Sequence, residues 1–485
     1  MLSFKKLDQG DFEKKQAKKI ERELPFFITI VSLLTSSGFG PYTILHKIKE
    51  ISLLPMVQAE SIKIIKRIDL LGIDPLTALN DAKDKPSSKA LGEFLSGYVS
   101  AIQSGGNVVN YLKSKMLSAF ERFKNGEEQA VEKVNGLVHA WLTIQIVVLA
   151  VFILVAAVGS NPITGNGDTS SQPPYMLLMF APAMSVIFML LVKNLVIANT
   201  PEIKAKEILK IGVPIIAAAL ILIFSNVFAG LGISPYILGG ALIAIGIRPA
   251  LKFAGMYKLN LDAEVSTPQI LRDITEARKA GIGPEKCVIR ACQRKDYRSF
   301  NKIANAISNK LEWGVSLNNV YTTLENEIKN FQVLISFRIL FEIITSGGGN
   351  VNTLDSLADT SEKIYNIQKH KREMLKPYVL VGFMLITITG FTTLMTIDSF
   401  VNINEQKTLG KPDKNAIDYK PFMEFVSLAV VAQAWLAGLF IGKVTSGAYS
   451  GGFMLSTWLT IITLVAIGFI QFHVLNVNSL FAPHS

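Results

Sequence analysis

The sequence predicts an all-α, polytopic membrane protein with about seven transmembrane helices and two duplicated cytoplasmic helical-bundle domains. Its mean hydropathy is +0.36 and 49% of its residues are hydrophobic, which is too apolar for an ordinary soluble protein. Within 1–136 no stretch alternates polar and apolar residues over any length, so short helices and not strands are expected there. Several features recur about 243 residues apart, which indicates an internal repeat.

The distribution of charge predicts which segments face the cytoplasm. Of the 49 Lys and Arg residues, 45 fall in three blocks and one short loop, at 1–136, 193–210, 248–376 and 443–452. Positive residues accumulate on the cytoplasmic side of membrane proteins. We therefore expect these segments to be cytoplasmic.

We interpret the first block, 1–136, as the first copy of a cytoplasmic helical domain. Its first 23 residues are strongly charged, which is not typical of a signal peptide. The apolar run Leu24–Leu34 that follows is too short to cross a membrane. We expect a solvated helix over 1–23 and a separate buried helix opened by Pro25. A further helix is predicted to start at Asp74-Pro75, because Asp caps free backbone amides and Pro fits the first turn.

Seven apolar stretches are read as spans, which places the N-terminus in the cytoplasm and the C-terminus outside. They are 137–158, 175–192, 211–229, 233–247, 377–397, 421–442 and 453–475. The predicted organisation has five parts. They are the first helical domain at 1–136, a transmembrane pair at 137–193, an inner loop and spacer hairpin at 194–247, the second helical domain at 248–376, and three transmembrane helices at 377–485.

The repeat is clearest in its helix-ending residues. Glycine ends a helix in a left-handed cap, and proline can begin the next helix but cannot continue the previous one. The predicted hinge and structural residues are Gly38, Gly40, Pro41, Gly105 and Gly106 in the first copy, and Gly281, Gly283, Pro284, Glu342, Gly347, Gly348 and Gly349 in the second.

The segment Glu342–Ala358, EIITSGGGNVNTLDSLA, joins an acidic residue, a glycine break and a leucine-spaced helix. Two helical units with Gly-x-Gly-Pro, a later glycine break and a following membrane pair resemble the F domain of type II secretion and type IV pilus systems. The second copy is the better match, because Gly97 to Val99 stand where the first copy would carry the acid. The spans after each copy resemble the archaeal branch, the archaellum and archaeal pilus platform proteins.

This resemblance implies a membrane-embedded assembly platform of an archaeal type IV pilus-like filament, without enzymatic activity of its own. It implies that a hexameric secretion-type ATPase docks on the cytoplasmic side, and that its motion passes to pilin-like subunits in the membrane. It further implies a location in the cytoplasmic membrane, in contact with lipid. We expect a homodimer.

The main positive feature is a segment that we expect to form a basic helix from Arg272 to Arg298. Three interpretations compete: a solvated face beside acidic lipid headgroups, a docking surface for an acidic cytosolic partner, and nucleic-acid binding. No aromatic platform accompanies the charges, which disfavours nucleic acid. The predicted docking residues are Arg272, Arg278, Lys279, Lys286, Arg290, Arg294, Lys295 and Arg298.

No catalytic, cofactor or metal site is predicted. The five histidines are scattered without ligand spacing, and Cys287 and Cys292 are expected to be reduced thiols. Gly438 to Lys443 superficially suggests a phosphate loop, but Val444 stands where Ser or Thr is needed. We therefore expect Gly438 and Gly442 to form a small-residue face for close helix packing.

A membrane transporter or permease is the alternative function. Such proteins need ionisable groups near the middle of the bilayer. In this chain His139, Lys193, Glu424 and Lys443 lie at the edges of the predicted spans. The sequence therefore favours the platform.

Overall fold

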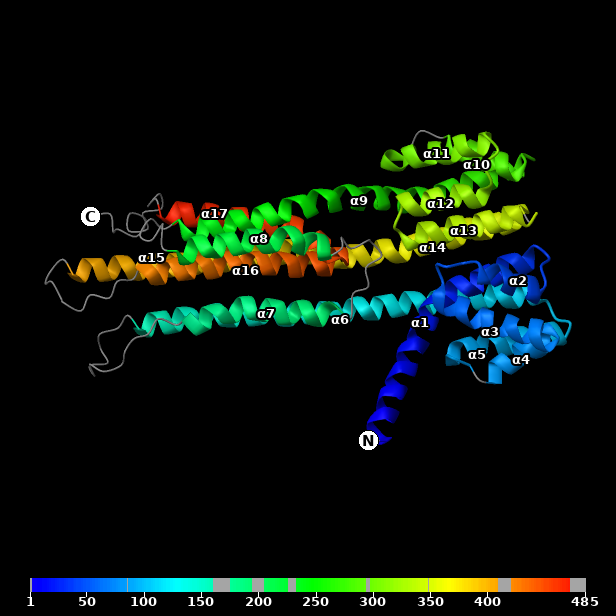
Figure 1. Ribbon diagram of the computed structural model, residues 1–485, viewed down its shortest axis with the longest axis horizontal. Coiled ribbons are helices and arrows are strands. Elements are labelled where there is room, and N and C mark those ends of the chain that lie inside the picture. Colours follow the sequence, from blue (N-terminus) through cyan, green and yellow to red (C-terminus); the bar gives the residue numbers. More distant parts are fainter. Residues whose placement is uncertain are drawn as a thin grey trace, which may run out of the picture. The chain divides into compact units, whose positions relative to one another are not determined.

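A computed structural model describes residues 2–84, 86–159, 175–193, 205–225, 233–293, 297–347, 349–408 and 420–471. Within these ranges the structure has helices, turns and loops but no strand, which confirms the all-α fold class. The helices (Figure 1) are α1 Leu2–Ser36, α2 Pro41–Lys49, α3 Pro55–Leu71, α4 Pro75–Asp84, α5 Lys89–Gln103, α6 Val108–Gly159, α7 Tyr175–Lys193, α8 Ala205–Phe224, α9 Ser234–Lys279, α10 Pro284–Cys292, the 3₁₀ helix η1 Arg298–Phe300, α11 Asn301–Glu312, α12 Leu317–Glu327, α13 Phe331–Thr345, α14 Val351–Leu375, α15 Pro377–Thr408, α16 Lys420–Ser446 and α17 Tyr449–Gln471.

The chain forms two compact units. Unit 1 comprises 1–129 and 258–370, and unit 2 comprises 130–257 and 371–485. In unit 1 the helices of both charged blocks share one apolar core, to which Phe27 contributes from α1 and Phe337 from α13. We call the helices of 1–129 the first set and those of 258–370 the second set.

The N-terminal helix differs from the prediction. The sequence indicated two helices divided near Pro25, but α1 is a single helix of 35 residues with Pro25 inside it. Proline removes one backbone donor from the helix. The residues that follow it, Phe26 and Phe27, are buried in the core of unit 1, and we infer that this burial offsets the missing bond.

Carboxylates cap two helices of the first set. The side chain of Glu23 on α1 accepts hydrogen bonds from the backbone N–H groups of Met56 and Val57, each at 2.9 Å. It thereby satisfies free donors at the start of α3. Asp74 accepts from the N–H of Leu76 at 3.0 Å, which confirms the helix start predicted at Asp74-Pro75.

The two sets have parallel helix endings. Among the described residues, Gly38, Gly72 and Gly105 of the first set have positive φ, and so do Gly281, Gly314 and Gly347 of the second set. Each glycine lies 242 or 243 residues from its counterpart. Only after the last of the three pairs does the spacing differ: α6 begins three residues after Gly105, whereas α14 begins four residues after Gly347.

Unit 2 contains most of the apolar helices. Five helical stretches among the described residues are long and apolar enough to cross a membrane, within α6, α9, α14–α15, α16 and α17. Two shorter apolar helices, Met179–Lys193 and Gly212–Ile223, lie where the sequence predicts two more spans. The chain is thus a multi-pass membrane protein, and seven as the number of spans stays a prediction.

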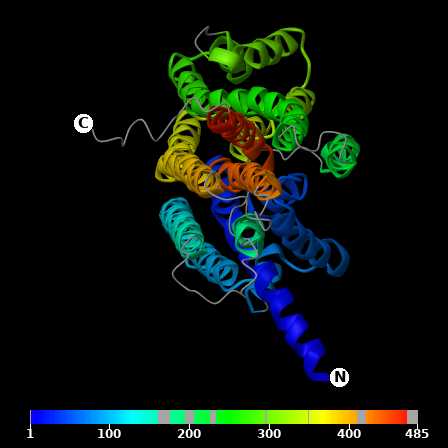
Figure 2. The same ribbon diagram turned by 90° about the vertical axis from the view of Figure 1, so that its left-hand side faces the viewer.

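Helices α16 and α17 form the closest helix pair of unit 2 and lie side by side (Figures 1 and 2). A Cβ atom on Gly438 would lie 2.5 Å from the Cα of Ser456, and one on Gly442 would lie 2.1 Å from the Cα of Gly452. Only residues without a side chain permit this approach between backbones. The small-residue face predicted from the sequence is confirmed.

We predict that Gly442→Val destabilises unit 2 by about 3 kcal/mol or more, because the added atoms overlap backbone that cannot move aside without separating the two helices. The measurement is the thermal unfolding midpoint of the purified protein in detergent. Gly255→Ala on α9 is the control, since no heavy atom lies within 4 Å of the Cβ it adds. Equal midpoints for the two variants would contradict this packing.

The Glu23 cap predicts a pH effect. Burial raises the pKa of the Glu23 carboxyl above its ordinary value of 4.5, although the amides of Val57 and Met56 act to lower it. The folded protein therefore holds this proton more tightly than the unfolded chain does. The resulting stability is present below pH 4.5 and is lost as the pH rises through the raised pKa.

We therefore expect the unfolding midpoint of the wild type to fall relative to that of Glu23→Gln as the pH rises from about 4 to 7. The glutamine keeps an acceptor for the α3 amides but does not titrate. Midpoints measured across this range give the difference directly. A difference that is constant, or that changes in favour of the wild type, would show that burial does not dominate at Glu23.

Candidate functional site at the junction of the two helical sets

The two sets meet within unit 1 where α1 and α2 face α13. The ring of Phe26 on α1 lies edge-on to the ring of Phe331 on α13, with centroids 5.0 Å apart. Helices α6 and α14 also touch, where the hydroxyl of Thr360 lies 3.9 Å from the sulfur of Met116. The junction therefore joins segments that are far apart in the sequence.

Glu342 is the charged centre of this junction. Its carboxylate lies 2.6 Å from a guanidinium nitrogen of Arg338, one turn earlier on α13, and 3.4 Å from the Nζ of Lys47 on α2. The Glu342 and Arg338 side chains are only 10% and 11% exposed. A buried carboxylate is stable only when it is paired. Lys47 of the first set and Arg338 of the second provide that pairing.

Arg338 is held by further groups. Its guanidinium lies 5.4 Å from the centroid of the Tyr321 ring on α12 and donates to the Oδ1 of Asn318 at 3.3 Å. Glu50, just after α2, lies 4.0 Å from the same guanidinium. These contacts fix the direction in which Arg338 presents its charge to Glu342.

The first set has no equivalent charged pair. The sequence placed Gly97 to Val99 opposite Glu342, which is wrong by at least one residue. Counted back from the left-handed Gly105 and Gly347, Ser96 and Ser100 on α5 occupy the places of Arg338 and Glu342 on α13. Both serines are exposed. The sequence identified Glu342 but missed Arg338 and Lys47. The four-residue spacing of Arg338 and Glu342 was a visible signal for the first pair, whereas Lys47 lies 295 residues away.

The second glycine break, Gly347 to Gly349, is hydrogen-bonded to the end of α9. Arg278 donates from its Nε to the carbonyl of Gly349 at 2.7 Å and from a terminal nitrogen to the carbonyl of Ile282 at 3.0 Å. A Cβ on Gly349 would lie 2.9 Å from the ring of Pro284. Gly347 adopts φ +74°, a conformation that favours glycine. Gly348 lies outside the described residues.

The predicted hinge residues of the first set and their counterparts take matching positions. Gly40 and Gly283 are the extended N-caps of α2 and α10, and Pro41 and Pro284 are the first residues of those helices. Gly38 and Gly281 have φ of +89° and +82°, and Gly105 has φ of +64° with Gly106 after it. Motion at these positions stays a prediction.

A cavity of about 570 Å³ opens between the end of α1 and the second glycine break. It is lined by Ser36, Ser37, Arg278, Gly347, Gly349, Asn350 and Val351. Its polar groups come from both sets. The cavity therefore belongs to the junction, and a change in the position of α1 against α14 would alter it.

The predicted basic helix is wrong as a single helix. Helix α9 ends at Lys279, the chain turns through Gly281, and α10 covers Pro284–Cys292. The physical reason is the left-handed glycine followed by a proline that starts a new helix. Arg294 and Lys295 lie outside the described residues.

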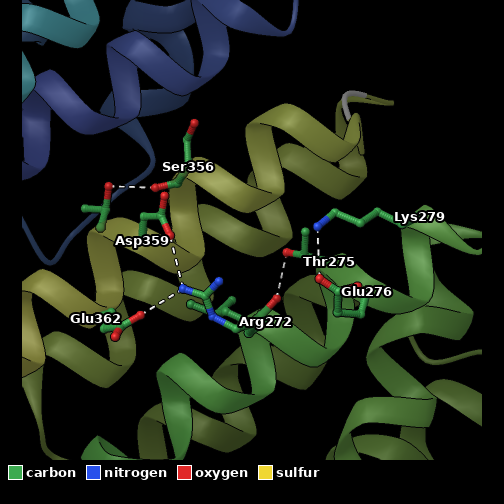
Figure 3. A network of polar contacts seen from close by, with 9 residues as sticks. Arg272, Thr275, Glu276, Lys279, Ser356, Asp359 and Glu362 are labelled. Carbon is green, nitrogen blue, oxygen red and sulfur yellow. Dashed lines mark hydrogen bonds and ion pairs between the residues drawn. The ribbon is translucent and has the colours of Figure 1, made fainter.

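Four of the predicted docking residues are used inside unit 1. Arg272 pairs with Glu362 at 2.8 Å and with Asp359 at 3.1 Å, both on α14 (Figure 3). The Glu362 contact raises the pKa of Arg272 most. Lys279 pairs with Glu276 at 2.9 Å, Arg278 holds the glycine break, and Arg298 lies 3.8 Å from Asp262. Lys286 and Arg290 are exposed on α10.

Unit 2 contains a small polar cluster among its apolar helices. The Ser185 hydroxyl on α7 accepts from the indole N–H of Trp141 at 3.1 Å and from the amide of Gln145 at 3.4 Å, and it donates to Gln433 at 3.4 Å. These groups are uncharged, and such contacts hold membrane helices together. Lys443 is buried at the end of α16, where it donates to the carbonyl of Gly447 at 2.7 Å.

The described residues contain no group of three or more potential metal ligands. Cys287 and Cys292 are unbonded and buried on α10. Burial raises the pKa of the Cys292 thiol to about 12. A thiol with such a pKa is a poor nucleophile at neutral pH.

These features define an all-helical, multi-pass membrane protein with a folded helical unit built from two sets. Residues 270–397 match the family model described as Type II secretion system (T2SS), protein F. This part of the chain, from the end of α9 into α15, is therefore a domain of the type II secretion system F family, as the sequence indicated. The match includes Glu342 and the second glycine break.

One similar protein is the uncharacterized protein MJ1286 of Methanocaldococcus jannaschii. The two chains are 22% identical over 426 residues, which cover 80% of this chain and 70% of the relative. No solved structure matches the chain.

We predict that the junction depends more on Glu342 than on Lys47. Glu342→Gln leaves Lys47 without its anion and Arg338 with only Glu50 at 4.0 Å, and it should cost about 3 kcal/mol of unfolding free energy. Lys47→Met leaves Arg338 in place and should cost about 1 kcal/mol. Unfolding midpoints of the single and double variants in detergent measure the coupling between the two residues.

Lys66→Met is the matched control, because Lys66 is an exposed cation of the first set away from the junction. It should leave the midpoint within about 1 °C of the wild type. If the effects of the two junction variants simply add, Lys47 and Glu342 do not interact and this ion pair does not hold the junction.

Proposed function

We propose that this protein is the membrane platform of an archaeal type IV pilus-like filament, an archaellum or a pilus. In this role it couples a cytoplasmic secretion-type ATPase to the insertion of pilin-like subunits or to filament rotation. The observation that carries the proposal is the F-domain match over 270–397. The platform is embedded in the cytoplasmic membrane and has no catalytic activity of its own.

The arrangement of the chain suits this role. Proteins of the F family are platforms of secretion and pilus assembly. Helix α6 runs for 52 residues and α9 for 46, and each continues from unit 1 into unit 2 with no break in the helix. A continuous helix resists bending because its backbone hydrogen bonds must distort. The chain thus passes between the units at these two places by helix and not by a loop.

The proposal also takes the two sets as copies of one F-type domain. The parallel left-handed glycines and the matching starts of α2 and α10 support a duplication. The second copy retains the acid at Glu342, whereas the first copy has Ser100 there. In the ion pair between Lys47 and Glu342, the first copy therefore provides the cation and the second provides the anion.

The test of the proposed function is gene deletion in the source organism, followed by electron microscopy of surface filaments. We expect filaments to be absent and to return when the wild-type gene is restored. Full filament assembly in the deletion strain would overturn the platform. Substrate-dependent flux through vesicles containing the purified protein would favour the transporter instead.

A variant at the second glycine break tests the role of the junction in assembly. Gly349→Val should abolish filaments without preventing membrane insertion, because its Cβ would lie 2.9 Å from the ring of Pro284. Gly106→Val in the first break is the matched control, since its Cβ meets only Ser104 Oγ at 3.4 Å and a carbonyl at 3.7 Å. Microscopy and membrane blots report both properties, and normal filaments from Gly349→Val would refute this role.

A further inference from the structure

Helices α2 and α10 have the same construction. Each has nine residues, begins with a proline after an extended glycine N-cap, and ends in a turn. The buried residues of α2 are Ile44, Leu45 and Ile48, and those of α10 at the same spacing are Cys287, Val288 and Ala291. Lys47 and Arg290 therefore occupy equivalent places, each two residues after the second buried residue of its helix and just before the third.

These two cations have different environments. Lys47 meets the Glu342 carboxylate of α13 at 3.4 Å. Arg290 and Lys286 are exposed and have no ion pair among the described residues. The only acid on α10 is Glu285 in its first turn. Arg290 and Lys286 thus form a positive surface at the place where the first set binds a carboxylate.

An exposed tryptophan extends this surface. Lys286 and Arg290 are four residues apart on one side of α10, and Gln293, the C-cap of this helix, follows three residues later. The Gln293 amide donates to the Glu312 carboxylate at 2.5 Å, and the next residue, Trp313, is 88% exposed. Tryptophan and arginine are the residues that most often anchor protein interfaces. We call Lys286, Arg290 and Trp313 the α10 surface.

We propose that the α10 surface docks an acidic helix of the secretion-type ATPase, with Arg290 and Lys286 binding its carboxylates as Lys47 binds Glu342. This inference rests on the proposed function and assigns the contact. It narrows the docking site to α10 and its neighbour, because Arg272, Arg278 and Lys279 are paired within unit 1, whereas Lys286 and Arg290 have no ion pair among the described residues.

A second copy of this chain is a poorer occupant. Its α13 carries the required acid, but Glu342 is 8% exposed and already paired with Lys47 and Arg338. Its α5 is accessible, but Ser100 stands where the carboxylate would be needed. The surface is therefore complementary to an acidic helix from a different protein.

The docking should be reversible. At the junction between the sets, Phe26 adds apolar burial against Phe331. The second set has no such aromatic residue in the equivalent place. Phe26 lies 15 residues before Pro41, the start of α2, and the residue 15 positions before Pro284, the start of α10, is Gln269. Binding on α10 therefore depends on charge and on Trp313, and charge attraction between exposed groups weakens as salt rises.

The test is direct binding between the full-length protein in lipid nanodiscs and the purified secretion ATPase of the same organism, at low and high salt. The variants are Lys286→Glu/Arg290→Glu and Trp313→Ala. The controls are Lys66→Glu, an exposed cation of the first set, and Leu71→Ala, which is 68% exposed and precedes Gly72 as Trp313 precedes Gly314. Unfolding midpoints check that every variant is folded.

We expect the double reversal to weaken binding at least about tenfold at low salt, with a smaller difference at high salt, and Trp313→Ala to weaken it several-fold. The controls should stay within about twofold of the wild type. If the wild type does not bind the ATPase at low salt, the proposed function fails and this inference fails with it.

Two other outcomes overturn the inference alone. Wild-type binding that both α10 variants retain would leave the platform intact and place the ATPase elsewhere. The second outcome would be variants that lose affinity for vesicles of anionic lipid but keep their affinity for the ATPase. In that case the α10 surface contacts the membrane and not a protein.

Discussion

The cost of burying one carboxylate determines how unit 1 is assembled. Helix α13 is apolar along most of its length, and a charged group within it must meet its opposite charge when it leaves water. Glu342 satisfies this need with Arg338 from its own helix and Lys47 from the first set. Apolar contacts such as Phe26 with Phe331 favour association in several orientations, whereas the ion pair selects one. The mutual position of the two sets thus depends on the pairing of Glu342, a buried acid that has no counterpart on α5.

That asymmetry separates the roles of two similar helical sets. An acid in place of Ser100 would give α5 the carboxylate that α13 has at Glu342. Arg290 could then bind α5 of another copy as Lys47 binds α13. With serine there, one cation-bearing surface is used inside unit 1 and its counterpart on α10 stays exposed. A contact between unlike surfaces does not close on itself as a twofold contact does. It leaves one unused surface on each set, and only the one on α10 is basic.

The sequence predicted what short-range chemistry determines. The helix start at Asp74-Pro75 follows from a cap within a few residues, and the Gly438–Gly442 face follows from side-chain size. The break before Pro284 is also a short-range feature, although the basic segment was predicted as one helix across it. The predictions from sequence failed where a residue's role depends on a partner far away in the chain. Pro25 stays inside α1 because Phe26 and Phe27 are buried, and Lys47 gains its role from a residue 295 positions away. Arg272 looked free for docking in sequence because its acids lie on α14.

The same contacts determine how a load on the α10 surface would travel under the proposed function. Helix α10 is joined to α9 by a short turn, and Arg278 near the end of α9 binds the carbonyls of Ile282 in that turn and Gly349 before α14. A displacement of α10 therefore acts on two long helices through one side chain. Since Pro284 also packs on Gly349, the turn and the break cannot move independently. The glycine break would then act less as a free hinge than as a coupling whose stiffness Arg278 sets.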